Sequence, residues 1–187
     1  MNFYHELQQL DTAELSDALD ACGIEGALLG IKPVVPGTKL IGPAFTVQYL
    51  AFEEQQTEFK NAGNYIDEVP ENAVIVIDNK GREDCTSWGD ILTQTACMRG
   101  IAGTVVHGAA RDVKLIREMN YPLYASAIYM RSEKNRVYKS QQQCMVTINN
   151  IEINPGDMIV GDDNGVLVIP KDKLTDVIQK AQNIKAT

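Results

Sequence analysis

The sequence has 187 residues, of which 44% are hydrophobic and 22% are charged, and its formal net charge is −8. This length allows one substantial hydrophobic core, and, with no export signal visible, it predicts a single cytoplasmic domain over residues 1–187. The acidic balance argues against direct nucleic-acid binding, and the lack of any run of about 20 apolar residues argues against a membrane span.

The first half of the sequence predicts alternating helices and strands. Its earliest clear signal is an apolar stripe at helical spacing that stops at Gly23. A continuous apolar run, Ala73–Asp78, is typical of a strand buried on both faces, and the turn signal Asn79-Lys80-Gly81 is expected to end it. The predicted elements are a helix over 12–22, a strand over 44–50, a polar and partly helical segment over 53–68, and a strand over 73–78.

The middle of the sequence predicts a strand-loop-helix-strand-loop unit. A helix is expected over 89–99, with Gly100 as its C-cap, followed by a buried strand over 101–107. A loop over 108–112 then leads to a helix over 113–119. Two loops that follow neighbouring strands in this way return to one edge of a sheet, where open α/β sheets tend to bind ligands.

The second half is rich in short strands separated by turns. Its predicted elements are strands over 123–129, 136–140, 144–148, 157–160 and 165–169, turns at 155–157 and 162–165, and a final helix over 171–185. The acidic turn Asp162–Gly165 lacks the length and the terminal Glu of a calcium-binding EF-hand loop. The whole pattern predicts one α/β domain.

The two loops of the central unit contain residues suited to binding an anionic substrate. The helix start consists of Gly89, Asp90, Ile91 and Leu92. Its unpaired N–H groups suit a substrate carboxylate, and Asp90 could hold a water molecule. Twenty residues (91–110) separate Asp90 from Arg111, whose planar guanidinium could bind the same carboxylate or a neighbouring keto oxygen.

A metal site in this sequence would depend on oxygen ligands. The four cysteines are scattered, and only His5 and His107 could supply imidazole, so zinc is not expected. Asp112 offers a hard carboxylate ligand to a cation that keeps its waters. The sequence therefore points to Mg²⁺ or Mn²⁺ at Asp112.

Each of these residues also has a purely structural interpretation. Arg111 and Asp112 could form an ordinary surface ion pair, and Asp90 could only stabilise the start of its helix. Trp88 is expected to be a packing residue, and His107 a structural or supporting group rather than a base. The residues alone leave both interpretations open.

Further motifs extend over nearly the whole chain. They are Leu15–Leu19, Gly42–Val47, the strand that ends at Asp78, Gly89-Asp90, Gly103, Gly108–Asp112, Pro155-Gly156-Asp157 and Asp163–Pro170. In this order they resemble the RraA-like family. It includes the regulator of ribonuclease E activity A and the 4-hydroxy-4-methyl-2-oxoglutarate aldolases. The Asp-x20-Arg-Asp spacing is the most specific element, because it matches the catalytic branch of that family.

The resemblance implies a swivelling β/β/α domain that assembles as a homotrimer or homohexamer. It implies that residues 89–92 and Arg111 bind a small 2-oxo acid, that Asp112 holds Mg²⁺ or Mn²⁺, and that Asp90 positions a proton-carrying water. The expected function is a class II pyruvate aldolase, an oxaloacetate decarboxylase, or both, acting through a pyruvate enolate. Family aldolases commonly carry a further C-terminal Glu, absent after Lys185, so the choice between the two reactions stays open.

The main alternative is a non-catalytic regulator that binds and inhibits an RNA-processing protein. Members specialised for that role can lack the Arg-Asp pair, which this sequence retains, so the enzyme is favoured. A methyltransferase is rejected, because no Gly-rich strand-to-helix loop with a following acid is present for S-adenosylmethionine.

Overall fold

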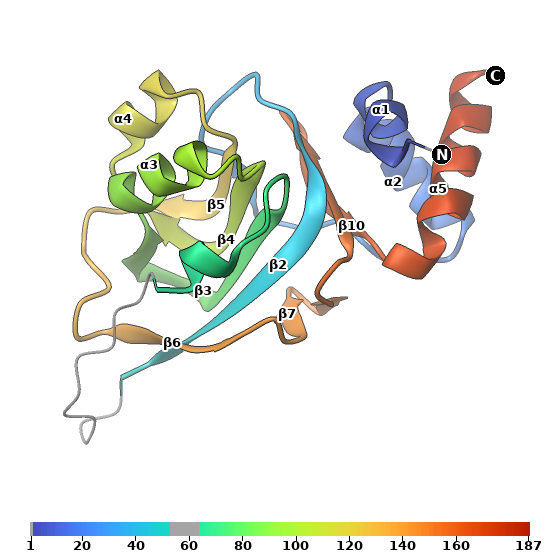
Figure 1. The fold of residues 1–187 in the computed structure, drawn as a ribbon. Helices are drawn as coiled ribbons and strands as arrows, with labels where there is room; N and C mark the ends of the chain where they lie inside the picture. The colour runs from blue at the N-terminus through green and yellow to red at the C-terminus, as the bar shows by residue number, and fades with distance from the viewer. Residues whose placement is uncertain (1, 53–63) are drawn as a thin grey trace.

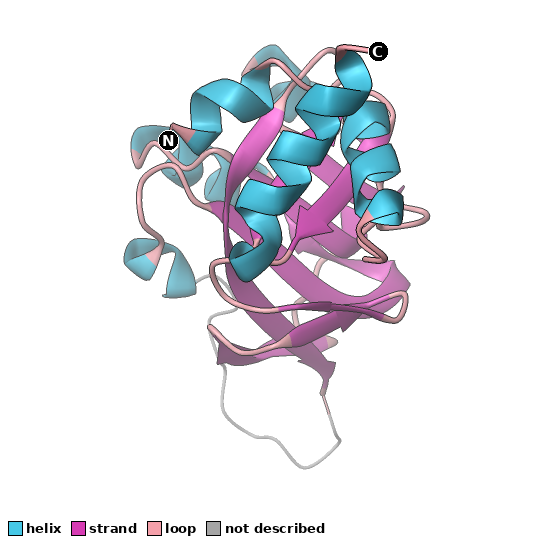
Figure 2. Ribbon diagram, turned by 90° about the vertical axis from the view of Figure 1, so that its right-hand side faces the viewer, coloured by secondary structure: helices cyan, strands magenta, loops and turns pink. Residues whose placement is uncertain are grey.

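The computed structural model describes residues 2–52 and 64–187. Helices and strands alternate around a large mixed sheet, which confirms the predicted α/β class (Figures 1 and 2). The strands are β1 (Lys32–Pro33), β2 (Leu40–Ala51), β3 (Val74–Trp88), β4 (Gly103–Ala110), β5 (Leu123–Ile128), β6 (Val137–Gln142), β7 (Val146–Ile148), β8 (Ile151–Ile153), β9 (Met158–Asp162) and β10 (Gly165–Ile169). The helices are α1 (Phe3–Gln8), α2 (Thr12–Ala21), α3 (Asp90–Met98), α4 (Val113–Glu118) and α5 (Leu174–Lys185), with 3₁₀ turns at Asn64–Glu68 and Lys171–Lys173.

The centre of the sheet is a parallel array. Its strand order is β1-β5-β4-β3-β2-β9-β10, and the strands β2, β3, β4 and β5 run parallel to one another. Because parallel strands end at the same edge, the loops that follow β3 and β4 meet there. These loops lead directly into α3 and α4, which lie side by side in Figure 1.

Both faces of this parallel array are covered by apolar packing. In β3, Ile75 and Ile77 join the core on the face that also packs against Leu92 of α3 and Val113 of α4. The alternate residues Val74 and Val76 join a second core on the opposite face. A strand buried on both sides needs an unbroken apolar run, which is why residues 73–78 show no alternation.

A third apolar cluster packs α1, α2 and α5 against the β9–β10 hairpin, away from α3 and α4 (Figure 1). Helix α2 begins with a capping box, in which the Glu14 N–H donates to Asp11 Oδ1 at 2.8 Å and the Asp11 N–H donates to Glu14 Oε2 at 2.9 Å. This reciprocal pair satisfies two N–H groups at the helix start. The predicted helix over 12–22 is confirmed.

The prediction that the strand over 73–78 ends at the following turn is wrong. Lys80 and Gly81 do adopt the left-handed conformation of a turn, with φ of 56° and 70°. However, β3 resumes pairing with β4 at Arg82 and continues irregularly to Trp88. The chain leaves the sheet and returns to it, so the turn interrupts the strand instead of ending it. Strand β4 correspondingly extends past His107 to Ala110.

Three short elements, α1, β1 and β8, were not predicted. Helix α1 has six residues, too few for a clear periodic signal. Strand β8 pairs with β7 through a two-residue turn, Asn149-Asn150, where φ is 49° and 68°. Two adjacent residues with positive φ are typical of a type I′ hairpin. The helical content expected within 53–68 is found at 64–68, and residues 53–63 lie outside the described part of the chain.

Acid is expected to loosen the attachment of α2 to the sheet. The Asp162 carboxylate, in the β9–β10 turn, accepts from the Thr12 hydroxyl and N–H at 2.6 and 2.8 Å. Partial burial tends to raise the pKa of Asp162, but these bonds, the Asn164 N–H and the Lys39 charge outweigh it and hold the pKa below its ordinary value. The stability that such a lowered pKa contributes is present above the unfolded-state value and is lost as pH falls through the folded-state value.

The test compares Asp162→Asn with the native chain by chemical denaturation between pH 7 and pH 3. We expect the variant to be less stable at pH 7. The difference should shrink as the pH falls below the unfolded-state pKa of about 3.9 and vanish below the lowered folded-state pKa, where the native carboxyl is itself protonated. Asp172→Asn, at an exposed position, is the matched control. A difference that stays constant down to pH 3 would contradict the expected role of the Asp162 charge.

Candidate functional site

The residues singled out in the two loops of the central unit lie together at the edge of the sheet. The Arg111 N–H donates to the Trp88 carbonyl at 3.0 Å, which ties the loop after β4 to the end of β3. The side chain of Trp88 is buried, donates from Nε1 to Thr93 Oγ1 at 2.8 Å and stacks on Tyr121. The expected packing role of Trp88 is confirmed, and its contacts fix where α3 begins.

Asp112 joins the two loops through its carboxylate. Its Oδ2 accepts from the Asp90 N–H, the first of α3, at 3.0 Å, and lies 3.7 Å from Nε of Arg111. The backbone of Asp112 is left-handed, with φ of 60°. Such a conformation is uncommon outside glycine, although Asp and Asn tolerate it best, and it tends to be retained at functional sites.

Gly89 is required by this close approach. A Cβ at position 89 would lie 2.7 Å from Oδ2 of Asp112, and 3.5 and 3.7 Å from Cγ and Nε of Arg111. Its φ of −157° is ordinary extended backbone, so the constraint is one of space and not of conformation. Any larger residue would push against the carboxylate that receives the Asp90 N–H.

Two N–H groups at the start of α3 are paired with protein carboxylates. Asp112 accepts from the Asp90 N–H, and Oδ1 of Asp90 accepts from the Ile91 N–H at 2.8 Å. A substrate carboxylate would therefore replace one of these acceptors or bind beside them. The Ile91 side chain is 75% exposed, whereas Leu92 packs partly on the core below.

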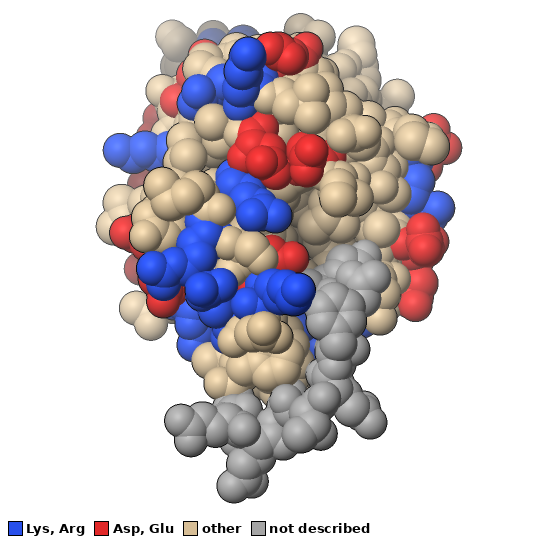
Figure 3. Space-filling view, turned by 90° about the vertical axis from the view of Figure 1, so that its left-hand side faces the viewer, with Lys and Arg blue, Asp and Glu red and all other residues tan. Residues whose placement is uncertain are grey.

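These residues line a small cleft of about 180 Å³. Drug-sized ligands need roughly 300 Å³ or more, so this cleft suits a smaller molecule. Acidic and basic side chains lie next to one another on this face of the molecule (Figure 3). The lining residues are Tyr49, Ser87, Trp88, Gly89, Asp90, Ile91, Leu92, Arg111, Asp112 and Glu133.

Three of the lining residues, Tyr49, Ser87 and Glu133, were not predicted from the sequence. Tyr49 comes from β2, Ser87 from the irregular end of β3, and Glu133 from the loop between β5 and β6. Burial raises the pKa of Tyr49 well above its ordinary value, against the lowering effect of a hydrogen bond with Tyr65 and with a further increase from Glu133, so its phenol stays neutral. No local motif marks these residues, because only strand pairing brings them together.

The side chains in the cleft that could bind a divalent cation are carboxylates. No group of three or more His, Cys, Asp or Glu side chains in the described part of the chain could enclose a metal ion. Mg²⁺, however, keeps several waters and binds through one or two carboxylates. Asp112 fits that requirement, because its side chain is 36% exposed and its Oδ1 makes no hydrogen bond with any described residue.

His107 does not line the cleft. Its Nδ1 lies 3.0 Å from Oδ1 of the fully buried Asp78, with the Lys80 ammonium 3.6 Å from Oδ2. Burial tends to raise the pKa of Asp78, but the bonds from His107 and from the Lys80 N–H, together with the Lys80 charge, outweigh it and lower that pKa. His107 thus supports the sheet edge, as the structural interpretation of this residue expected.

Comparison with known proteins gives consistent results. The family model RraA-like (Aldolase/RraA) matches residues 12–168. Protein DlpA of Legionella pneumophila is 59% identical over the whole chain, which spans only 30% of the length of DlpA. A protein of Halalkalibacterium halodurans, provisionally named a 4-hydroxy-4-methyl-2-oxoglutarate aldolase, is 35% identical and matches all of this chain and 85% of its own.

A crystal structure of an uncharacterized Pseudomonas syringae protein has a TM-score of 0.91 and 44% identity. The match covers 98% of this chain and 86% of that one.

None of the helices in the described part of the chain is long and apolar enough to cross a membrane.

Proposed function

Because the chain belongs to the RraA-like family, with the fold expected of it, we propose that it is a divalent-cation-dependent lyase acting on a small 2-oxo acid. The reactions are retro-aldol cleavage of compounds of the 4-hydroxy-4-methyl-2-oxoglutarate type and decarboxylation of oxaloacetate. Both reactions release pyruvate by way of its enolate. The protein would act as a homotrimer or homohexamer in the cytoplasm.

One observation carries this proposal. The carboxylate of Asp112, the guanidinium of Arg111 and the first N–H of α3 meet within hydrogen-bond or ion-pair distance in a small cleft. This arrangement offers the positive charge of Arg111 for an anionic substrate, beside one partly exposed carboxylate for a cation. The relatives named as aldolases support the choice of a lyase.

The chemistry follows from where charge develops. In retro-aldol cleavage the bond between C3 and C4 breaks, the 4-hydroxyl loses its proton, and C4 becomes a carbonyl carbon. The bonding electrons form an enolate whose negative charge lies on the former keto oxygen. Arg111 would bind the substrate carboxylate or this oxygen, and a donor placed where charge develops is worth about 100- to 1000-fold in rate.

Asp112 would hold Mg²⁺ or Mn²⁺, which when bound would supply a second positive charge for the enolate oxygen. Oδ1 of Asp90 accepts from the Ile91 N–H, so the second oxygen of Asp90 would be the one that orients a water. Such a water can take the hydroxyl proton in cleavage and return a proton to C3 of the enolate. Decarboxylation uses the same enolate, with carbon dioxide as the leaving group in place of the carbonyl compound.

A regulator of an RNA-processing protein remains the alternative, because the same family contains both activities. The two functions make different demands on the cleft. A regulator needs a binding surface, and nothing in that role requires the Asp90–Asp112–Arg111 arrangement. We therefore place the enzyme first.

Removal of divalent cations is expected to abolish pyruvate release. The test follows pyruvate from oxaloacetate and from 4-hydroxy-4-methyl-2-oxoglutarate with Mg²⁺, with Mn²⁺ and with excess EDTA. Reactions without protein correct for spontaneous decarboxylation, and re-addition of the cation should restore turnover. An equal rate in EDTA would refute cation dependence. No turnover, combined with tight stoichiometric binding to an RNA-degradation complex, would favour the regulator.

A further inference from the structure

We propose that Thr93, a buried residue of α3, is a positioning residue that holds the groups of the cleft in place. Its hydroxyl joins the indole of Trp88 to the carbonyl of Gly89. This bridge fixes the first turn of α3, where the Asp90 N–H donates to the carboxylate of Asp112. The inference rests on the proposed function and adds to it a residue that acts through the backbone rather than by touching the substrate.

Both hydrogen-bonding directions of the Thr93 hydroxyl are used. Its Oγ1 accepts from Nε1 of Trp88 at 2.8 Å and donates to the Gly89 carbonyl at 2.8 Å. The Thr93 N–H donates to the same carbonyl at 3.1 Å. The indole can only donate, so the single hydrogen of the hydroxyl points to Gly89. The bridge therefore has one arrangement, and because Thr93 is fully buried, solvent does not compete for either partner.

An ordinary helical threonine has a smaller role. Ser and Thr in helices often donate to the carbonyl four residues earlier, and Thr95 does so to Ile91 at 3.0 Å. Thr93 differs because its second partner belongs to the core. The buried ring of Trp88 stacks on that of Tyr121, with centroids 5.9 Å apart and an angle of 9° between the planes. The start of α3 is thus tied to the core as well as to its own helix.

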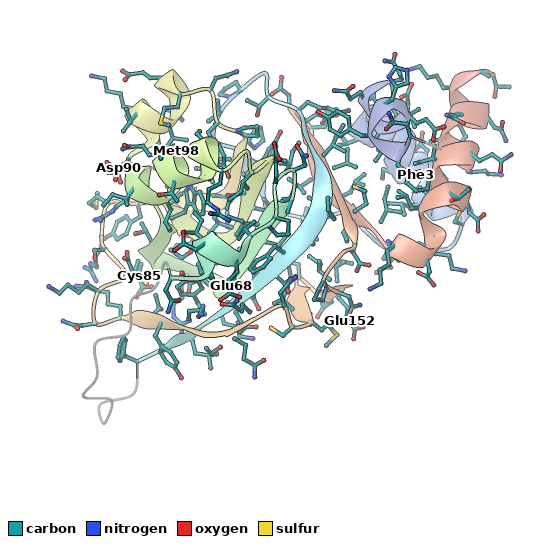
Figure 4. The ribbon with its side chains drawn as sticks, viewed as in Figure 1. Phe3, Glu68, Cys85, Asp90, Met98 and Glu152 are labelled. Carbon is teal, nitrogen blue, oxygen red and sulfur yellow. The ribbon has the colours of Figure 1, made fainter. Side chains whose placement is uncertain are left out.

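Helix α3 has no side-chain cap at its own N-terminus. It runs from Asp90 to Met98, both labelled in Figure 4, and its N-cap is Gly89, which has no side chain. Other groups must therefore orient the first turn. On the exposed side Asp112 accepts from the Asp90 N–H at 3.0 Å, and on the buried side Thr93 holds the Gly89 carbonyl.

The space around Gly89 leaves little room for the first turn to move. A Cβ there would lie 2.7 Å from Oδ2 of Asp112, and the Trp88 carbonyl accepts from the Arg111 N–H at 3.0 Å. Without the Thr93 bridge the peptide between Trp88 and Gly89 can turn, and both contacts change together. Because a misplacement of about 1 Å can cost on the order of 100-fold in rate, the loss should fall mainly on kcat.

The kinetic test compares three variants. Thr93→Val keeps the shape of the side chain without its hydroxyl, Thr93→Ser keeps the hydroxyl without the methyl group, and Thr95→Val removes the ordinary bond to Ile91. Pyruvate release from oxaloacetate and from 4-hydroxy-4-methyl-2-oxoglutarate is measured with Mn²⁺. We expect Thr93→Val to lower kcat about tenfold or more with KM changed less than about twofold. Thr93→Ser should recover most of the native kcat, and Thr95→Val should match the native chain.

Tryptophan fluorescence reports on the bridge without any turnover. Trp88 is the single tryptophan of the sequence, so tryptophan emission comes from the indole that donates to Thr93. A hydrogen bond from the indole N–H lowers the energy of the excited state. Thr93→Val should therefore emit at shorter wavelength than the native chain, and Thr93→Ser should not. Thermal melting shows whether each variant is folded, and the unpaired indole should lower the Tm of Thr93→Val by about 5 °C.

A variant of the donor keeps the test decisive should Thr93→Val fail to fold. Trp88→Phe removes the indole N–H and keeps an aromatic ring to pack against Tyr121. It should also lower kcat with little change in KM. Two changes that remove one bond should not add, so the double variant is expected to be little worse than Thr93→Val alone. Fully additive losses would overturn the bridge.

The outcomes separate the inference from the proposed function. Native kinetics in Thr93→Val or in Trp88→Phe would overturn the inference alone, as would unchanged emission of Thr93→Val or a Thr93→Ser variant that recovers no activity. An equal loss in Thr95→Val would show a general weakening of α3 and would also overturn it. No pyruvate from the native chain would overturn the proposed function and, with it, the catalytic role of Thr93.

Discussion

Replacing Asp112 with asparagine is expected to lower kcat/KM for pyruvate release by about 100- to 1000-fold, the range observed when one charge-stabilising group is removed from an active site. Asparagine retains an oxygen that can accept from the Asp90 N–H, and it tolerates the left-handed backbone that Asp112 adopts. The change therefore removes the charge with little disturbance of the loop.

The measurement is steady-state kinetics at saturating Mn²⁺, accompanied by Mn²⁺ binding followed by electron paramagnetic resonance. Weakened Mn²⁺ binding together with lost turnover would agree with Asp112 as the cation ligand. Asp20→Asn, an exposed acid near the end of α2, is the matched control and should change neither quantity. Full activity in Asp112→Asn would exclude the proposed role of this carboxylate.

The second large effect is expected from Gly89→Ala. The added methyl group would lie 2.7 Å from Oδ2 of Asp112, closer than ordinary contact allows, so the carboxylate must move away from the Asp90 N–H. A shift of about 1 Å in such a group can cost on the order of 100-fold in rate. Stability should change by only about 1 kcal/mol, the usual scale for replacing a favourable N-cap residue by alanine.

Kinetics and thermal melting of Gly89→Ala test this expectation together. The double variant with Asp112→Asn gives a sharper criterion, because two changes that act through one carboxylate should not add. We expect the double variant to be little worse than Asp112→Asn alone. Fully additive losses would mean that Gly89 acts through some other contact.

The sequence predicted the part of the site that lies within one continuous segment. Gly89 and Asp90 stand at the start of a predicted helix, and Arg111 and Asp112 stand in the loop after a predicted strand. The parallel pairing of β3 with β4 brings these two segments together. The spacing could not reveal that Asp112 caps the first N–H of α3, since that contact depends on a left-handed backbone angle. Whether these residues bind the substrate and cation is left to the experiments above.

The rest of the cleft could not be predicted, for a topological reason. Tyr49 and Glu133 are 84 positions apart and are joined through the pairing of β2 with β6, which no local periodicity records. Ser87 lies on a strand segment that the turn at residues 79–81 hid from prediction. Of the missed elements, β8 had a usable signal, because Asn149-Asn150 followed by alternating residues is typical of a hairpin.

Strand β2 connects the layer of terminal helices with the cleft. Its first residues pair with β9, next to the layer of α1, α2 and α5, and its later residues pair with β3 and then β6. Tyr49, near the C-terminal end of β2, lines the cleft. Removal of α1 or α5 would uncover Ile41 of β2, which packs in the same cluster as these helices, on the strand that also contributes Tyr49 to the cleft.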